Sequence, residues 1–458
     1  MNFLSFAPQA APHETARAGV RRSATTIRGR PPGPFFPVST LLALLALLSA
    51  TPGLAANSTA PGFKKIQLTD QFWAEGADFG DFNHDGVMDV ASGPFWYAGP
   101  DFKTRHAYRP ATSFFVHTNA AGVPEKIPGY EGALGEKNAY SDNFFTFVYD
   151  FNHDGWPDIM VIGFPGKEAW WYENPQGRPG YWQRHLLYTN VDNESPVLTS
   201  LIGDGKPQLV CNSDGYFGYA QADWNAPDKP WQFHRISPKG PWGKFQHGLG
   251  VGDVNGDGRM DILEKDGWWE QPASLAGDPV WTFHPFPFSE KGCAQMYAYD
   301  VNGDGLNDVI CCLNPHGYGL AWYEQVRNHG EITFRRHLIL NPDATPNKDG
   351  VVFSQPHSMA LVDMDGDGLK DIVTGKRFWA HGKNGPDPDE NNAAVLYWFK
   401  LVRTANGGAD FVPTLIDDNS GVGTQVMTGD AGNPKYPAIV VGNKKGVFVF
   451  QRPDVPQD

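Results

Sequence analysis

Residues 253–261 read Asp-Val-Asn-Gly-Asp-Gly-Arg-Met-Asp, and this short stretch decides the fold because it is repeated. The pattern Asp-x-Asn/Asp-x-Asp-Gly-x-x-Asp recurs intact at residues 81–89, 150–158, 300–308 and 363–371. Two degraded copies begin at Ser200 and Asp430. Five intact copies exceed what chance produces, so the chain is built from internal repeats.

Every acidic stretch lies inside a longer repeat of four apolar runs. The seven copies begin at residues 81, 150, 200, 253, 300, 363 and 430, a spacing of 47 to 69 residues. One run enters the acidic loop and a second leaves it; an aromatic run such as AWWYEN at 169–174 and a weaker run such as WQRHLLY at 182–188 complete the unit. Four short strands repeated seven times predict an all-β fold: a seven-bladed β-propeller over residues 62–452, closed by the strand at residues 447–450.

The composition agrees with this prediction and excludes two other classes of protein. The 458 residues include 52 glycines, 38 prolines and 15 tryptophans, which favours strands and tight turns over a helical bundle. With 37 Lys and Arg against 51 Asp and Glu, the net charge of −14 repels a phosphate backbone, so we expect no nucleic acid partner.

The N-terminal segment has the pattern of a secretory leader. Residues 38–50, VSTLLALLALLSA, are too few for the roughly 20 apolar residues that cross a bilayer as a helix. Arginines precede this run, and the small residues 52–56 after it suit signal peptidase. We predict a signal peptide at residues 1–56, no membrane span after cleavage, and an extracytoplasmic location, periplasmic or secreted. The true start codon stays open because the segment before the apolar run is long for a leader.

Four cysteines are too few to form a disulfide framework in a chain of this size. Cys211, Cys293, Cys311 and Cys312 each lie in an apolar, strand-like run, which favours buried thiols. One bridge from Cys293 to Cys311 or Cys312 stays open, because these runs are expected to form neighbouring strands.

The acidic loops have the composition of calcium sites. Loop positions 1, 3, 5 and 9 supply carboxylate or amide oxygens and position 7 a backbone carbonyl, the hard ligands that Ca²⁺ prefers. The glycine at position 6 permits the sharp turn around the ion. The sequence therefore predicts about five structural calcium ions, held by Asp81, Asn83, Asp85 and Asp89; by Asp150, Asn152, Asp154 and Asp158; by Asp253, Asn255, Asp257 and Asp261; by Asp300, Asn302, Asp304 and Asp308; and by Asp363, Asp365, Asp367 and Asp371.

The third and seventh units have lost these ligands and are expected to bind no ion. The replacements are Ser200, Ile202 and Gln208 in the third unit, and Gly432, Pro434 and Ala438 in the seventh.

A second set of residues lies six positions before each loop, where the innermost strand begins on the opposite face of the propeller. These positions are Glu75, Phe144, Glu194, His247, Ala294, His357 and Thr424. Because equivalent positions in a propeller point toward one axis, we predict that His247, His357 and Glu194 hold a central divalent metal, with zinc and magnesium as candidate ions. Glu75 is an alternative to Glu194, and purely structural histidines are the alternative to a metal site.

The ends of the second strands add five catalytic candidates to the same face. They are His316 and Tyr318 in NPHGYG, and Lys376, Arg377 and His381 in GKRFWAHG. Lys376 and Arg377 would stabilise a developing enolate, unless they form a solvated turn. His316 or Tyr318 would move the proton.

Two resemblances extend this interpretation. Phe79-Gly80 before the first acidic loop and Gly93-Pro94 after it make the repeats similar to FG-GAP or VCBS propeller repeats. Residues 246–272, 314–325, 353–382 and 421–426 resemble the propeller part of fungal aldos-2-ulose dehydratases and their secreted bacterial relatives. The second resemblance implies a carbon–oxygen lyase that eliminates water beside the carbonyl of a keto or anhydro sugar with the help of a metal ion.

The sequence also departs from the second family, and another function competes with it. The fungal enzymes carry cupin-type domains beyond the propeller, so we do not expect an isomerase activity linked to those domains. The competing hypothesis is a non-catalytic propeller of the lectin or adhesion kind, which binds carbohydrate or protein and needs no converging metal ligands.

Overall fold

Short strands joined by tight turns make up the structure, a computed structural model that describes residues 62–111, 114–119, 121–128, 140–431, 433 and 435–452. The predicted signal peptide at residues 1–56 lies outside the described residues, as do Gly432 and Pro434. In the described residues the strands run from β1 to β30 without any helix. Consequently, no helix in this part of the chain has the length and hydropathy that a bilayer crossing needs.

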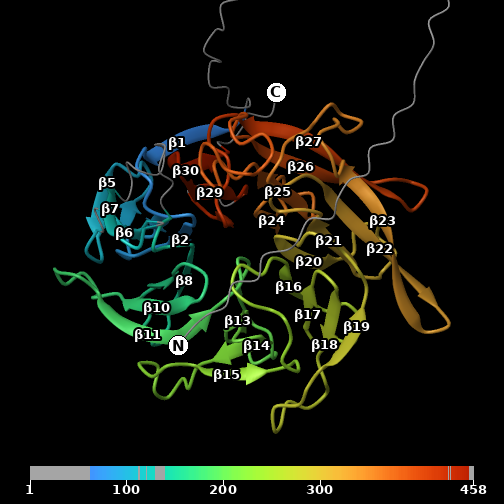
Figure 1. Ribbon diagram of the computed structural model, residues 1–458, viewed down its shortest axis with the longest axis horizontal. Helices are drawn as coiled ribbons and strands as arrows, with labels where there is room; N and C mark the ends of the chain where they lie inside the picture. Colours follow the sequence, from blue (N-terminus) through green and yellow to red (C-terminus); the bar gives the residue numbers. More distant parts are fainter. Residues whose placement is uncertain are drawn as a thin grey trace, which may run out of the picture. The chain divides into compact units, whose positions relative to one another are not determined.

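Antiparallel meanders of four strands account for nearly all of the sheet structure, and Figure 1 shows them arranged around a centre, as in a β-propeller. The separate four-stranded sheets are β2 (Asp78–Gly80), β3 (Asp89–Ser92), β4 (Phe95–Ala98) and β5 (Thr104–Ala107); β8 (Phe145–Tyr149), β9 (Asp158–Ile162), β10 (Lys167–Glu173) and β11 (Gln183–Val191); β12 (Val197–Thr199), β13 (Gln208–Ser213), β14 (Tyr216–Gln221) and β15 (Gln232–Arg235); β24 (Met359–Val362), β25 (Asp371–Gly375), β26 (Leu396–Arg403) and β27 (Ala409–Asp417); and β28 (Val426–Gly429), β29 (Ala438–Asn443) and β30 (Gly446–Gln451) with β1 (Lys64–Thr69).

The remaining strands form one larger sheet and one hairpin. The eight-stranded sheet contains β16 (Leu249–Gly252), β17 (Asp261–Glu264), β18 (Gly267–Glu270), β19 (Thr282–Pro285), β20 (Gln295–Tyr299), β21 (Asp308–Cys312), β22 (Leu320–Asn328) and β23 (Glu331–Leu340). The hairpin pairs β6 (Phe114–Thr118) with β7 (Pro124–Pro128).

The count of separate four-stranded sheets is therefore five, whereas the sequence predicts seven blades. The difference arises where β16 and β20 pair in parallel, at Leu249 with Gln295 and at Gly250 with Met296, which merges two meanders into one sheet. A Cβ atom at Gly250 would lie 2.1 Å from the carbonyl oxygen of Met296, so only glycine allows the two backbones to approach so closely.

The N-terminal strand β1 completes the last sheet. It pairs antiparallel with β30, from Lys64 opposite Gln451 to Thr69 opposite Val447. The sequence analysis assigned the closing position to residues 447–450, but β30 is the third strand of this sheet and β1 is the outermost. The error has a physical reason: β1 is a partly exposed edge strand, KKIQLT, and lacks the continuous apolar run of the other strands.

A buried aspartate at the ninth position ties each intact loop to the third strand of its sheet. In residues 253–261, Asp261 accepts hydrogen bonds from the backbone N–H of Val254 at 2.9 Å and of Gln271 at 3.0 Å. The same pair of bonds is made by the aspartates at 89, 158, 308 and 371. Burial raises the pKa of Asp261 to about 7, because the charged form is poorly solvated there.

Neighbouring meanders are joined by side chains that leave the end of the third strand. Gln325 is buried, and its Nε2 donates to the carbonyl oxygen of Val254 in the preceding meander at 2.8 Å and to that of Asn307 at 2.6 Å. Gln271 and Asn174 make equivalent contacts, to Leu201 and Phe82. These amides satisfy carbonyl groups that the acidic loops would otherwise leave unpaired.

Histidines of the outermost strands cover tryptophans of the third strands. The rings stack with centroids 4.1 to 4.3 Å apart in the pairs Trp96–His106, Trp171–His185, Trp268–His284 and Trp322–His337. Apolar residues of adjoining meanders pack between the sheets, such as Val254 against Val309. The four cysteines lie in this core as free, buried thiols, as the composition favours.

We expect Gln325→Ala to lower the free energy of unfolding by about 1–3 kcal/mol, because it leaves the carbonyl groups of Val254 and Asn307 without their donor. Denaturant titration at fixed calcium concentration measures this change. The matched control is Gln232→Ala, which removes an exposed glutamine from the outer strand β15. Equal stabilities of the two variants would contradict the role of Gln325.

Candidate functional site

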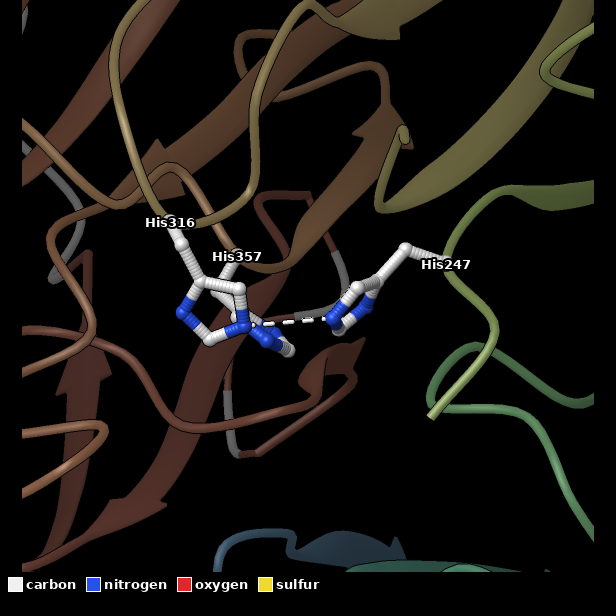
Figure 2. Close-up of side chains that lie close together, drawn as sticks. All are labelled: His247, His316 and His357. Atoms are coloured by element: carbon white, nitrogen blue, oxygen red, sulfur yellow. Dashed lines mark hydrogen bonds between the residues drawn. The ribbon is translucent and has the colours of Figure 1, made fainter. Parts of the chain in front are cut away.

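Three histidines converge where inner strands begin. His247 precedes β16, His357 precedes β24, and His316 lies in the turn between β21 and β22. One ring nitrogen of each lies within 4.8 Å of the others, and Nε2 of His316 is 3.1 Å from Nε2 of His247. Figure 2 shows the three imidazoles pointing toward one another from separate segments of chain. The structure thus brings the predicted pair His247 and His357 together and adds His316 to them.

Burial keeps two of these histidines neutral. It lowers the pKa of His247 to about 4, and the carboxylate of Glu194 only partly offsets the effect. Burial also lowers the pKa of His357 far below its ordinary value, and the charge of Arg377 adds to this. A neutral imidazole is the form that binds a metal ion.

A buried arginine lies directly behind the histidines. Arg377 donates from Nε to Oε2 of Glu75 and from Nη1 to Oε2 of Glu194, both at 3.2 Å. Its Nη1 also lies 2.8 Å from Nε2 of His357. Because a neutral imidazole nitrogen that faces an N–H must accept, this contact assigns the lone pair to Nε2 of His357.

The two carboxylates around Arg377 balance its charge. Burial alone would raise the pKa of Glu194, but the positive charge of Arg377 beside it holds the pKa well below the usual range. Glu75 is also buried. Lys444, also buried, is a second cation that interacts electrostatically with Glu75, so two cations and two carboxylates lie together here.

Backbone hydrogen bonds between inner strands set the predicted register. The N–H of Glu194 donates to the carbonyl of Gln246 at 2.9 Å, and the N–H of Thr424 donates to the carbonyl of Glu75 at 3.1 Å. Phe144 lies below Arg377, with the guanidinium carbon 5.9 Å from the ring centroid. Positions that lie six residues before the acidic loops therefore do meet around one centre.

Asp387 orients two histidines at the rim and was not found from the sequence. Its Oδ2 lies 2.7 Å from Nδ1 of His381 and 3.5 Å from Nδ1 of His316. Burial alone would raise the pKa of Asp387, but these two histidines hold it well below the usual range. Asp387 lies in the long segment between β25 and β26, which has no counterpart in the repeat pattern and so offered no signal.

Two other catalytic candidates make different contacts. Lys376 is fully buried, its Nζ donates to Oγ of Ser354 at 2.7 Å, and burial lowers its pKa to about 8. The hydroxyl of Tyr318 donates to the carboxylate of Asp389. The contact of Tyr318 therefore leads into the segment between β25 and β26, that of Lys376 leads into the segment between β23 and β24, and neither described contact reaches the three histidines.

The donor set fits a divalent metal ion that prefers nitrogen ligands, such as zinc. His247, His316 and His357 would hold the ion, with Glu194 beside His357 at 3.3 Å. In the described structure, Nδ1 of His247 and of His357 are buried and have no hydrogen-bond partner. For a metal ion to bind Nε2 of His357, the contact between that nitrogen and Arg377 would have to break. Arg377 would then still be held by its hydrogen bonds to Glu75 and Glu194.

Comparisons with known proteins support the repeat and the fold. Residues 300–374 match the family model described as an FG-GAP-like repeat. No curated protein matches the chain. Solved structures are similar as well, and the three described next have TM-scores of 0.41, 0.36 and 0.34.

Three of these solved structures illustrate the similarity. An Agrocybe aegerita lectin that recognises non-reducing terminal N-acetylglucosamine is 17% identical, with 81% of this chain and 85% of the lectin covered and a TM-score of 0.41. A Trichoderma reesei carbohydrate-active enzyme of family AA12 is 11% identical, with 87% and 98% covered and a TM-score of 0.36. The Photorhabdus luminescens Tc holotoxin pore is 13% identical, with 79% and 18% covered and a TM-score of 0.34.

The match at residues 300–374 spans β21, β22, β23, β24 and most of β25, together with the acidic loops at residues 300–308 and 363–371. It confirms the FG-GAP repeat that the sequence analysis expected. Together with the ring of antiparallel meanders, it identifies the chain as a β-propeller that contains an FG-GAP-like repeat.

Proposed function

We propose that this protein is a metal-dependent carbohydrate lyase of the dehydratase type, which eliminates water beside the carbonyl of a keto or anhydro sugar. The observation that carries the proposal is the convergence of His247, His316 and His357 next to a buried arginine and two carboxylates. A propeller that only binds sugars needs no such set of converging nitrogen ligands. An ion bound to these histidines would polarise the sugar carbonyl and acidify the neighbouring C–H.

The protein's own residues would then handle the proton and the developing charge. His381 is our candidate base: its Nδ1 contacts Asp387, which directs Nε2 away from the carboxylate, and its side chain is 40% exposed. Arg377 supplies a fixed positive charge beside the site. His381 takes the proton from the carbon next to the carbonyl, and the electron pair of that C–H bond forms a double bond to the following carbon. The hydroxyl of that carbon leaves with the proton that His381 returns to it, so that one water molecule is lost.

We also propose that the eight-stranded sheet is two blades, β16 to β19 and β20 to β23, which makes the propeller seven-bladed. Each half is a complete antiparallel meander whose first and second strands are joined by an intact acidic loop. We further propose that the protein is exported and works outside the cytoplasm, because the leader pattern at residues 1–56 precedes the first blade.

The five intact loops are proposed to hold calcium, and the degraded third loop supports this. In the intact loop at 363–371, oxygen atoms of Asp363, Asp365 and Asp371 lie within 4.8 Å of one another. In the third loop, Nε2 of Gln208 donates a hydrogen bond to Asp204 at 3.1 Å. This N–H group interacts with the Asp204 carboxylate in the way that a bound cation would interact with the carboxylates of an intact loop.

We expect chelation of calcium to lower the melting temperature, since an ion that binds only the folded state at 100 times its Kd adds about 2.7 kcal/mol per site. Differential scanning calorimetry with and without chelator measures the shift, and elemental analysis measures the stoichiometry. Asp304→Ala should remove one ion, whereas the matched variant Asp204→Ala in the degraded loop should remove none. Binding of fewer ions than half of the intact loops would refute the proposal.

We expect His247→Ala to abolish turnover and to remove the non-calcium metal, while the calcium-dependent melting transition stays nearly unchanged. The reason is that His247 supplies one of three converging nitrogens but contacts none of the acidic loops. Turnover is followed on a panel of keto and anhydro sugars by the ultraviolet absorbance of the conjugated enone, and metal content by elemental analysis.

The matched control for this variant is His284→Ala, which removes a histidine that stacks on Trp268 in an outer strand. It should keep both activity and metal. Full activity and metal content in His247→Ala would rule out the site. Absence of turnover on every keto sugar, combined with tight glycan binding by the wild type, would favour a lectin-like propeller instead.

A further inference from the structure

An exposed phenylalanine lies next to the histidine centre. Phe245 precedes His247 by two residues, and 45% of its surface is exposed. Its backbone has a φ of 66°, a left-handed conformation that bulky L residues rarely adopt. Neither feature helps the fold, because an exposed ring buries little apolar surface and the left-handed backbone is strained.

The position of Phe245 is tied to that of the site. Its N–H donates to the carbonyl of Asp192 at 2.8 Å, and the carbonyl of Gln246 accepts from the N–H of Glu194 at 2.9 Å. Residues 245–247 are thus paired with residues 192–194. The same two backbone bonds hold the exposed ring, His247 and Glu194 in one arrangement.

A row of aromatic rings connects Phe245 to the centre. Phe245 contacts Phe164 edge to face, with ring centroids 5.3 Å apart, and Phe164 lies 5.4 Å from both Tyr140 and Phe144. Phe144 is the ring below Arg377. An apolar wall therefore runs from the solvent-exposed ring to the base of the histidine centre.

A shallow, open polar depression lies beside the chain segments that carry Phe164 and Phe245, because Gly166 and Lys244 line it. It has a volume of about 570 Å³ and is lined by Asn190, Asp192, Asp214, Lys239, Trp242 and Lys244, among others. Lys244 lies across Gly166, the residue two positions after Phe164. Residues with amide, carboxylate and ammonium groups thus line a depression that reaches Lys244, the residue directly before Phe245.

We propose that Phe245 is a stacking platform for a second sugar unit, so that the substrate is an oligosaccharide held by its penultimate ring. A pyranose presents an apolar C–H face and a rim of hydroxyl groups, which matches an aromatic ring beside a polar depression. This assignment rests on the proposed carbohydrate-directed function and names its substrate class. It places one sugar at the histidines and the next on Phe245.

Isothermal titration with neutral disaccharides (maltose, cellobiose and laminaribiose) and with glucose tests the platform. The wild type should bind at least one disaccharide about tenfold more tightly than glucose, and Phe245→Ala should lose that advantage. Phe245→Trp should retain it, because the larger ring still offers a face. The matched control is Tyr181→Ala, which removes an exposed aromatic ring from the loop between β10 and β11.

The same titration on His247→Ala separates this proposal from the proposed function. Disaccharide binding that survives in His247→Ala and is lost in Phe245→Ala supports the platform, whatever happens to turnover. Equal binding by the wild type and Phe245→Ala overturns it, as does a wild type that binds no sugar of the panel. Turnover in His247→Ala would refute the metal centre and leave the platform standing.

Discussion

The structure depends on a carboxylate that is buried at the ninth position of each intact acidic loop. Both oxygens of Asp261 accept backbone N–H groups, one from its own loop and one from the end of the third strand. A charge at this depth is tolerated only because these donors compensate for lost hydration. The bonds fix the loop against the meander, and the fixed loop offers its carbonyls to the amide of the next meander, as Val254 does to Gln325.

The rigid face with the acidic loops explains how the opposite face can hold a cluster of buried polar and charged side chains. The loops hold one end of each inner strand, and this fixes the position of the opposite end. His247 and His357 therefore meet Glu194 although 53 residues separate Glu194 from His247 and 110 separate His247 from His357. Arg377 compensates for two buried carboxylates that would otherwise repel each other. Functional groups held by strand ends in this way are more precisely placed than groups on long loops.

The repeats in the sequence predict much of the fold and part of the histidine site, and the features that they do not predict have physical causes. The all-β fold and the meeting of His247 with His357 followed from spacing, because a repeated strand carries its register with it. Asp261 was read as a calcium ligand, and its backbone bonds were missed because spacing cannot show which donors face an oxygen. Asp387 was missed because its segment belongs to no repeat. The parallel pairing at Gly250 was missed because it depends on how closely two backbones approach.

The pairing of β1 with β30 also constrains how the protein is made. Residues 64–69 are synthesised before every other described strand, but their partner at residues 447–451 is synthesised after all of them. At about 5–20 residues per second, the first strand waits roughly 20–80 s for its partner. During that time every other meander can form in order, while β1 remains an unpaired edge that invites association with other chains. Ring closure therefore has to wait until every other described strand has been synthesised, and until then the edge of β1 is open to pairing with another copy of the chain.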